Sequence, residues 1–94
     1  MLIKDMFLDL GYGYKVALKE VYAVIPMDTI SAIALFRRYS RDNKVIRATK
    51  GRKAHSYLLL NNGMVFASCL TADEIVERTW EMKRMMRALE NAEV

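Results

Sequence analysis

Short runs of apolar or alternating residues, typical of β-strands, recur along the first 70 residues. Three such runs come first, at residues 6–10, 15–18 and 21–25. The Gly-Tyr-Gly between the first two predicts a tight turn, because glycine tolerates positive φ. It is not a dinucleotide-binding fingerprint, since no third glycine follows at the required spacing. The run at 21–25 is apolar throughout and stops at Pro26, so we predict a central, fully buried strand there.

The stretch after Pro26 changes to a helical period, and we predict a helix at residues 30–41. Asp28 or Thr29 is expected to cap it, because their side-chain oxygens can accept hydrogen bonds from the amides of the first turn. Asn43 can adopt the left-handed conformation that ends a helix. The predicted apolar stripe consists of Ile30, Ile33 and Ala34, widened by Leu35 and Phe36.

Strand patterns return at residues 44–49, 54–60 and 64–70. Two turns separate these runs: a basic one at 49–55 and the Asn-Asn-Gly at 61–63, a strong hairpin signal. We therefore predict an antiparallel meander of three strands. The basic turn would be a hairpin tip at one end, and Asn-Asn-Gly would close the other.

A long helix is predicted at residues 71–92, because Thr71 and Glu74 match a capping box and an apolar face follows. Its length of about 30 Å exceeds what a small domain needs to cover its sheet. The surplus predicts contact with another copy of the chain. The expected interface residues are Trp80, Met82, Met86 and Leu89.

These elements predict an α+β fold with a small antiparallel sheet, one short central helix and one long C-terminal helix. The 94 residues are 53% hydrophobic and 28% charged, which fits one domain, with the sheet and first helix in 1–70 and the last helix in 71–92. The core of so short a chain is limited, which favours a homo-oligomer.

Few residues could carry enzyme chemistry. Cys69 and His55 are the only cysteine and histidine, so one chain can build neither a disulfide nor a zinc site from them. No carboxylate stands out as a general acid, and we expect a non-enzymatic protein without metal or cofactor. Residues 1–5 lack a signal-peptide pattern and no run is long enough to span a membrane, so we expect a cytoplasmic protein without a membrane partner.

Positive charge is concentrated in one segment. Residues 37–53 contain eight basic residues and one acid, a net charge of +7, whereas the rest has seven basic residues and ten acids, a net charge of −3. Complementing a helix dipole explains Arg37, Arg38 and Arg41 at the end of the first predicted helix. It does not explain Lys50, Arg52 and Lys53 on the basic turn. Such cations suit a phosphate backbone, and Gly51 would let the main chain approach closely.

Several short motifs together resemble one known family. They are Leu-Asp-Leu-Gly-Tyr-Gly at 8–13, Ala-Val-Ile-Pro at 23–26, Ile-Arg-Ala-Thr-Lys-Gly-Arg-Lys at 46–53 and a Thr-x-x-x-Ile-x-x-Arg helix. In this order, across residues 7–80, the chain resembles the RemA-like extracellular matrix regulatory proteins. The resemblance implies a bacterial cytoplasmic DNA-binding regulator of matrix or osmoprotection genes. It also implies a fold similar to LytTR domains and assembly into a closed ring that can wrap DNA.

The resemblance also implies which residues bind double-stranded DNA. A family Arg-Arg pair falls on Arg52 and Lys53, a further family arginine falls on Glu20, and another falls on His55. With the charge argument, the predicted DNA-binding residues are Arg52, Lys53, Lys50, Gly51, Lys19 and His55.

Two alternatives remain open at the level of sequence. The same basic turn could bind RNA, with Tyr12 or Tyr57 stacking on unpaired bases. The chain could instead be an oligomeric scaffold that recruits an acidic protein partner, which Glu20 makes easier to envisage.

Overall fold

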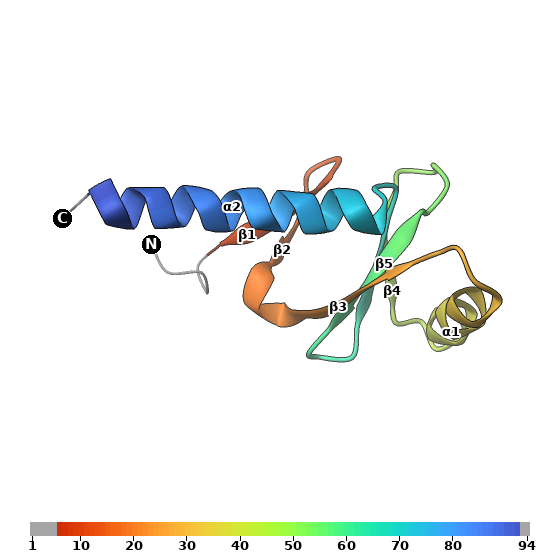
Figure 1. Cartoon of the computed structure of the whole chain (residues 1–94). Coiled ribbons are helices and arrows are strands. Elements are labelled where there is room, and N and C mark those ends of the chain that lie inside the picture. The colour runs from red at the N-terminus through yellow and green to blue at the C-terminus, as the bar shows by residue number, and fades with distance from the viewer. Residues whose placement is uncertain (1–5, 93–94) are drawn as a thin grey trace.

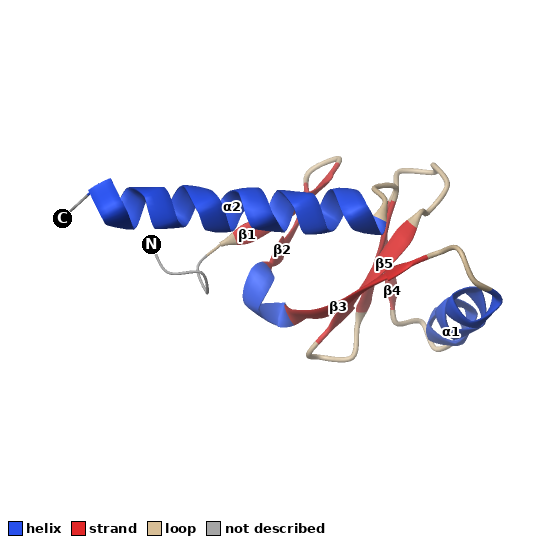
Figure 2. Cartoon of the chain, viewed as in Figure 1, coloured by secondary structure: helices blue, strands red, loops and turns tan. Residues whose placement is uncertain are grey.

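The computed structural model describes residues 6–92, which form two sheets and two α-helices (Figures 1 and 2). The elements are, in order, β1 (Phe7–Gly11), β2 (Tyr14–Ala17), the short 3-10 helix η2 (Leu18–Glu20), β3 (Val21–Pro26), α1 (Ile30–Arg41), β4 (Val45–Ala48), β5 (Ser56–Leu60), β6 (Val65–Ser68) and α2 (Ala72–Ala92). Residues 1–5, used above to argue against a signal peptide, lie outside this range. No helix in residues 6–92 is both long and apolar enough to cross a bilayer.

Strands β1 and β2 form the predicted hairpin, a separate two-stranded sheet. The strands pair antiparallel, with Leu8 opposite Val16. Gly11, Tyr12 and Gly13 all have positive φ, and the Asp9 carboxylate accepts a hydrogen bond from the Gly11 amide at 2.8 Å. The two glycines therefore present Tyr12 on a tight turn, as their conformational freedom allows.

The larger sheet is mixed, with the strand order β3-β5-β6-β4. Strand β5 pairs antiparallel with β3 and with β6, and residues 61–63 make the β5–β6 turn as predicted. Strand β4, however, pairs parallel with β6 and does not touch β5. The prediction of a three-stranded antiparallel meander is therefore wrong at β4. The reason is the crossover through α1, which carries the chain from one edge of the sheet to the other.

The prediction of a central, fully buried β3 is also wrong, because β3 is an edge strand and Tyr22 is exposed. Its continuous apolar run has a different cause. Val21 and Val24 pack into the core beneath α2, whereas Ala23 and Ile25 pack into the core beneath α1. Both faces of the strand are therefore partly covered, although one of its edges is open.

Each face of the larger sheet has its own hydrophobic core. On one face Leu58 and Leu60 of β5 pack with the β1–β2 hairpin and Ile75 of α2. On the other, Tyr57 and Leu59 pack with α1. The alternation along β5 thus places α1 and α2 on opposite faces, and all five β5 residues are buried.

Helix α1 has the predicted boundaries but not the predicted buried face. The Thr29 hydroxyl accepts from the Ala32 amide at 3.0 Å, and Asn43 has a φ of 56° just past the end, as expected. Ala32 and Phe36 are the buried residues, whereas Ile30 is 88% exposed. Phe36 determines the buried face, because its large ring packs on Tyr57 with the ring centroids 5.4 Å apart.

Helix α2 starts at the predicted cap, where Thr71 Oγ1 accepts from the Glu74 amide at 3.1 Å. Its first half packs against both sheets through Ile75, which is fully buried. Its second half extends past the β1–β2 hairpin (Figure 1), and the molecule measures 50 × 24 × 23 Å as a result.

Candidate nucleic-acid interface

The basic segment at residues 49–55 begins with a tight turn, as predicted. The Arg52 amide donates to the Thr49 carbonyl at 3.0 Å, and Lys50 and Gly51 have φ values of 50° and 82°. Positive φ at both central residues is typical of a type I′ turn. The turn is nevertheless not a hairpin tip. It begins a connection from β4 to β5 that passes the end of β6, which lies between them.

Tyr12 brings the β1–β2 turn next to this basic turn. The Lys50 ammonium lies 5.8 Å and the Arg52 guanidinium carbon 5.9 Å from the centroid of the Tyr12 ring. Both turns project on the same side of the molecule, opposite the β5–β6 turn (Figure 1). We call Lys50, Arg52 and Lys53 together with Tyr12 the cationic tip.

Sequence reasoning considered Tyr12 only as a residue that could stack on RNA bases and missed its contact with the cations. The available signal was the pair of glycines, which places an aromatic side chain at an exposed turn. Which turn it would meet depends on the packing of the two sheets, and no local pattern encodes that.

The cationic tip carries positive charge without a nearby counter-charge. Lys50, Gly51, Arg52 and Lys53 are exposed. Among residues 6–92 the only ion pair within 4.0 Å is Arg84–Glu77 on α2, so no carboxylate in that range neutralises the tip. A Cβ added at Gly51 would meet no atom within 4 Å, so the turn faces open space.

The other two predicted DNA-binding residues lie elsewhere. Lys19 is in η2, where its carbonyl accepts from the Asn61 side chain at 3.0 Å, and Asn61 follows the end of β5 that is remote from the tip. His55 is exposed, but it lines a shallow depression with Asp28 and Asp73. The structure therefore brings together Lys50, Gly51, Arg52 and Lys53, puts His55 beside carboxylates and separates Lys19 from the tip. Glu20 follows Lys19 in η2, and the Glu20 carbonyl accepts a hydrogen bond from the Asn61 backbone amide.

Tyr57 cannot stack on a base, so that part of the RNA alternative is wrong. The side chain is 0% exposed, and its hydroxyl donates to the Ala32 carbonyl at 2.9 Å. Burial, with a smaller contribution from Tyr39, raises the pKa of Tyr57 above its ordinary value. The residue joins β5 to α1 and belongs to the core.

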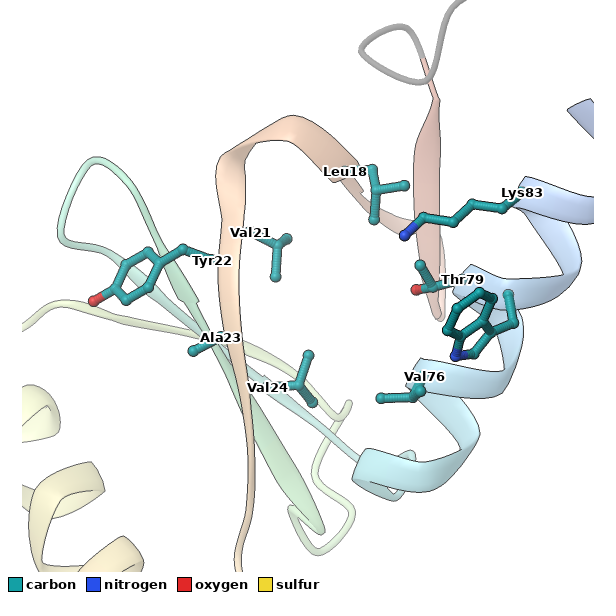
Figure 3. A pocket seen from close by; sticks show the side chains of 9 residues that line it. Leu18, Val21, Tyr22, Ala23, Val24, Val76, Thr79 and Lys83 are labelled. Atoms are coloured by element: carbon teal, nitrogen blue, oxygen red, sulfur yellow. The ribbon is translucent and has the colours of Figure 1, made fainter.

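A second surface is a groove of about 500 Å³ between the open edge strand β3 and α2 (Figure 3). Val21 and Val24 point from β3 toward α2, while Val76, Thr79 and Trp80 line the opposite wall and Lys83 lies at its rim. The Lys83 ammonium lies 5.3 Å from the centroid of the Trp80 ring. The groove is thus mainly apolar with one cation at its border.

The four residues predicted for an oligomer interface divide into two pairs. Trp80 and Leu89 are 52% and 61% exposed and are free for contact with another chain. Met82 packs on the core of its own chain, and Met86 is only 6% exposed. Helical periodicity predicted an apolar face but did not show which of its residues the chain itself would cover.

Comparison with known proteins adds a family assignment. The sequence profile of the RemA-like family, described as "Extracellular matrix regulatory protein A-like", matches residues 7–79. One similar protein, from Desulfatibacillum aliphaticivorans, is 28% identical over 71 residues, which cover 76% of this chain and 80% of that protein. Another, from Thermodesulfovibrio yellowstonii, is 26% identical over 80 residues, which cover 85% and 94%. Both are named "Putative regulatory protein".

The matched region includes the β1–β2 turn with Tyr12, the basic turn with Lys50 to Lys53, and the start of α2 as far as Thr79. It therefore spans the whole cationic tip and most of the groove. The resemblance that the sequence motifs indicated is confirmed, and this chain belongs to the RemA-like family.

Proposed function

We propose that the protein is a cytoplasmic transcriptional regulator that binds double-stranded DNA through the cationic tip, as a ring-shaped homo-oligomer. The observation that carries the proposal is the tip itself, where Lys50 and Arg52 gather around Tyr12 with no carboxylate of residues 6–92 within 4.0 Å. Phosphate oxygens would supply the missing negative charge. The family description supports a role at extracellular matrix genes, and the resemblance adds osmoprotection genes.

Glu20 does not add an acid to the cationic tip. Although a family arginine falls on that position, Glu20 lies in η2, near the β5–β6 turn and away from the tip. The acid therefore leaves the charge around Tyr12 unchanged. Similarity to LytTR domains remains a prediction from the family resemblance.

Copies of the tip around a ring would act together. One tip offers three cations, which make few phosphate contacts. Several tips on one duplex gain avidity, because each later contact is intramolecular. A curved array of tips would also favour DNA that bends easily, so selectivity could come from deformability as well as from base contacts.

The test is a titration of labelled duplex DNA at several salt concentrations. Affinity should fall steeply with salt for the unmodified protein, and the Arg52→Ala, Lys53→Ala double variant should lose most of the binding and of the salt dependence. The matched control is Arg84→Ala, Arg87→Ala, which removes the same charge from exposed positions in the second half of α2, and light scattering checks that it keeps the oligomer of the unmodified protein. Absent or salt-insensitive binding of duplex DNA would overturn the proposal.

RNA binding is the second candidate, and exposed Tyr12 is the specific observation that favours it. An aromatic ring beside cations can stack on an unpaired base. Competition decides between the two: unlabelled single-stranded RNA that displaces the duplex at a lower concentration than unlabelled duplex would identify RNA as the ligand.

A further inference from the structure

Five more cations lie between the second half of α1 and the tip, and all are exposed: Arg37, Arg38, Arg41, Lys44 and Arg47. None of them forms an ion pair with any residue in 6–92, although Asp42 lies among them. The helix dipole accounts for cations in the last turn of α1. It does not account for Lys44 and Arg47, which lie beyond the helix.

Strand β4 arranges part of this charge in a line that leads to the tip. It is an edge strand that pairs only with β6, so its other edge is open. Lys44 directly precedes β4, Arg47 lies on it, and the basic turn directly follows it. Lys44 and Arg38 also line one shallow cleft of about 210 Å³ at the end of α1, which Asp42 shares without an ion pair to either cation. We call Arg38, Lys44 and Arg47 the basic stripe.

Arg47 is held in place before any ligand arrives. Its guanidinium carbon lies 5.4 Å from the centroid of the Phe36 ring, and Phe36 is itself buried against Tyr57. Contact with the ring face restrains the guanidinium, while its N–H groups remain able to donate to an oxyanion. Less conformational freedom is then lost on binding.

The stripe and the tip are separated by a distance that suits duplex DNA. Strand β4 is extended, so Lys44 and Thr49, where the basic turn begins, lie about 16 Å apart at roughly 3.3 Å per residue. The grooves of B-DNA are about 12 Å and 6 Å wide, so cations this far apart can reach phosphates on both sides of one groove.

We propose that the basic stripe is a second phosphate-binding surface for duplex DNA, which would lie along the open edge of β4 with the stripe and the tip on opposite sides of one groove. This inference rests on the proposed function. It adds Arg38, Lys44 and Arg47 to the DNA contacts and gives the duplex a direction across the protein.

The experiment compares Lys44→Gln, Arg47→Gln with Arg84→Gln, Arg87→Gln, which removes two charges from α2. Each lost phosphate contact lowers the slope of log affinity against log salt by about 1, so the stripe variant should lose about 2 for each protomer that engages the duplex. Its affinity should fall about tenfold or more, and about equally for every duplex sequence. The α2 variant should match the unmodified protein both in affinity and, by light scattering, in oligomer mass, and Lys44→Arg, Arg47→Lys should retain the slope.

A folding check and two outcomes complete the test. Thermal melting checks that the Gln variants are folded; if loss of Arg47 from Phe36 unfolds the chain, Arg38→Gln, Lys44→Gln replaces the stripe variant, since both are exposed. If the protein binds duplex through the tip while the stripe variant behaves like the α2 variant, the stripe is overturned and the proposed function stands. If the unmodified protein does not bind duplex DNA, both are overturned.

Discussion

At the scale of single residues, Tyr12 and Tyr57 show how differently two tyrosines act in one small fold. Tyr12 is held out on a turn between two glycines and touches Lys50 and Arg52, whereas Tyr57 is buried beneath α1. Their sequence neighbourhoods explain only the first. The glycines mark Tyr12 as a turn residue, but Tyr57 lies in an apolar strand whose two faces look equally buried in the sequence.

Replacing Tyr12 by Ala should weaken DNA binding about fivefold. Loss of the Tyr12 aromatic ring removes cation–π contacts with Lys50 and Arg52 that are worth about 1 kcal/mol in total at an exposed site. Without these contacts the two cations are less restrained in the free protein, so they lose more conformational freedom on binding. The salt slope should not change, because every phosphate-binding group is still present. Titrations with labelled duplex measure both. Tyr12→Phe is the control and should bind like the unmodified protein. Equal weakening by the Phe and Ala variants would contradict a role for the aromatic ring of Tyr12.

Tyr57 should make stability depend on pH in the alkaline range. Because burial raises the pKa of Tyr57, the unfolded chain loses this proton at a lower pH than the folded one. The contribution is complete below the unfolded pKa of about 10 and is lost as the pH rises from there through the folded pKa. Thermal melts between neutral pH and pH 11 should show the fall, and Tyr57→Phe should reduce it.

The same Tyr57→Phe variant should be less stable by about 1 kcal/mol near pH 7, since the hydrogen bond to the Ala32 carbonyl is lost. Denaturant unfolding measures that difference. An unchanged alkaline fall in Tyr57→Phe would show that other groups cause it.

At the scale of elements, local chemistry was sufficient for boundaries and insufficient for pairing. Thr29, Asn43 and Thr71 mark helix ends because their roles depend on neighbouring backbone groups alone. The parallel pairing of β4 with β6 depends on where α1 delivers the chain, which no local pattern reports. The exposed Ile30 shows the same limit within a helix, because Phe36, not the count of apolar residues, determines the buried face.

The start of α2 provides a test of such a local contribution. Thr71→Ala removes the acceptor of the Glu74 amide and should lower the free energy of unfolding by about 1 kcal/mol. Thr71→Ser keeps an acceptor and should restore most of it. Chemical denaturation of the three proteins measures the difference. A cost as large for Ser as for Ala would mean that the Thr71 methyl group, and not the cap, matters.

At the scale of the whole molecule, the sequence predicted that positive charge is concentrated in one segment, and the structure shows where that segment lies. The segment of net charge +7 becomes a tip and a stripe at the open edge of β4. The predicted DNA-binding set survives as a cluster only for its consecutive members, residues 50–53. Lys19 is a predicted DNA contact because its neighbour Glu20 stands where the family has an arginine. The fold shows that η2, which carries both residues, lies at the end of β5 that is remote from the tip. The long α2 helix leaves apolar side chains exposed, among them Trp80 and Leu89, and another molecule would be needed to cover them.

Assembly should depend on the exposed apolar residues of α2 and not on the buried ones. Trp80→Asp and Leu89→Asp should each lower the mass of the oligomer measured by light scattering, because an exposed apolar side chain at an interface becomes a charge. Met86→Asp is unsuitable, since it would put a carboxylate into the core and unfold the chain. Ile30→Asp on α1 is the matched control, because Ile30 is even more exposed and lies far from the groove.

The same variants connect assembly to DNA binding. If several tips engage one duplex, a folded Trp80→Asp or Leu89→Asp monomer keeps its cations but loses avidity, an effect of about a hundredfold or more. The stripe and tip variants lose affinity by a different route, since they retain the oligomer and lose salt dependence. A monomeric unmodified protein, or α2 variants that keep both mass and affinity, would contradict the ring and leave each tip to bind DNA alone.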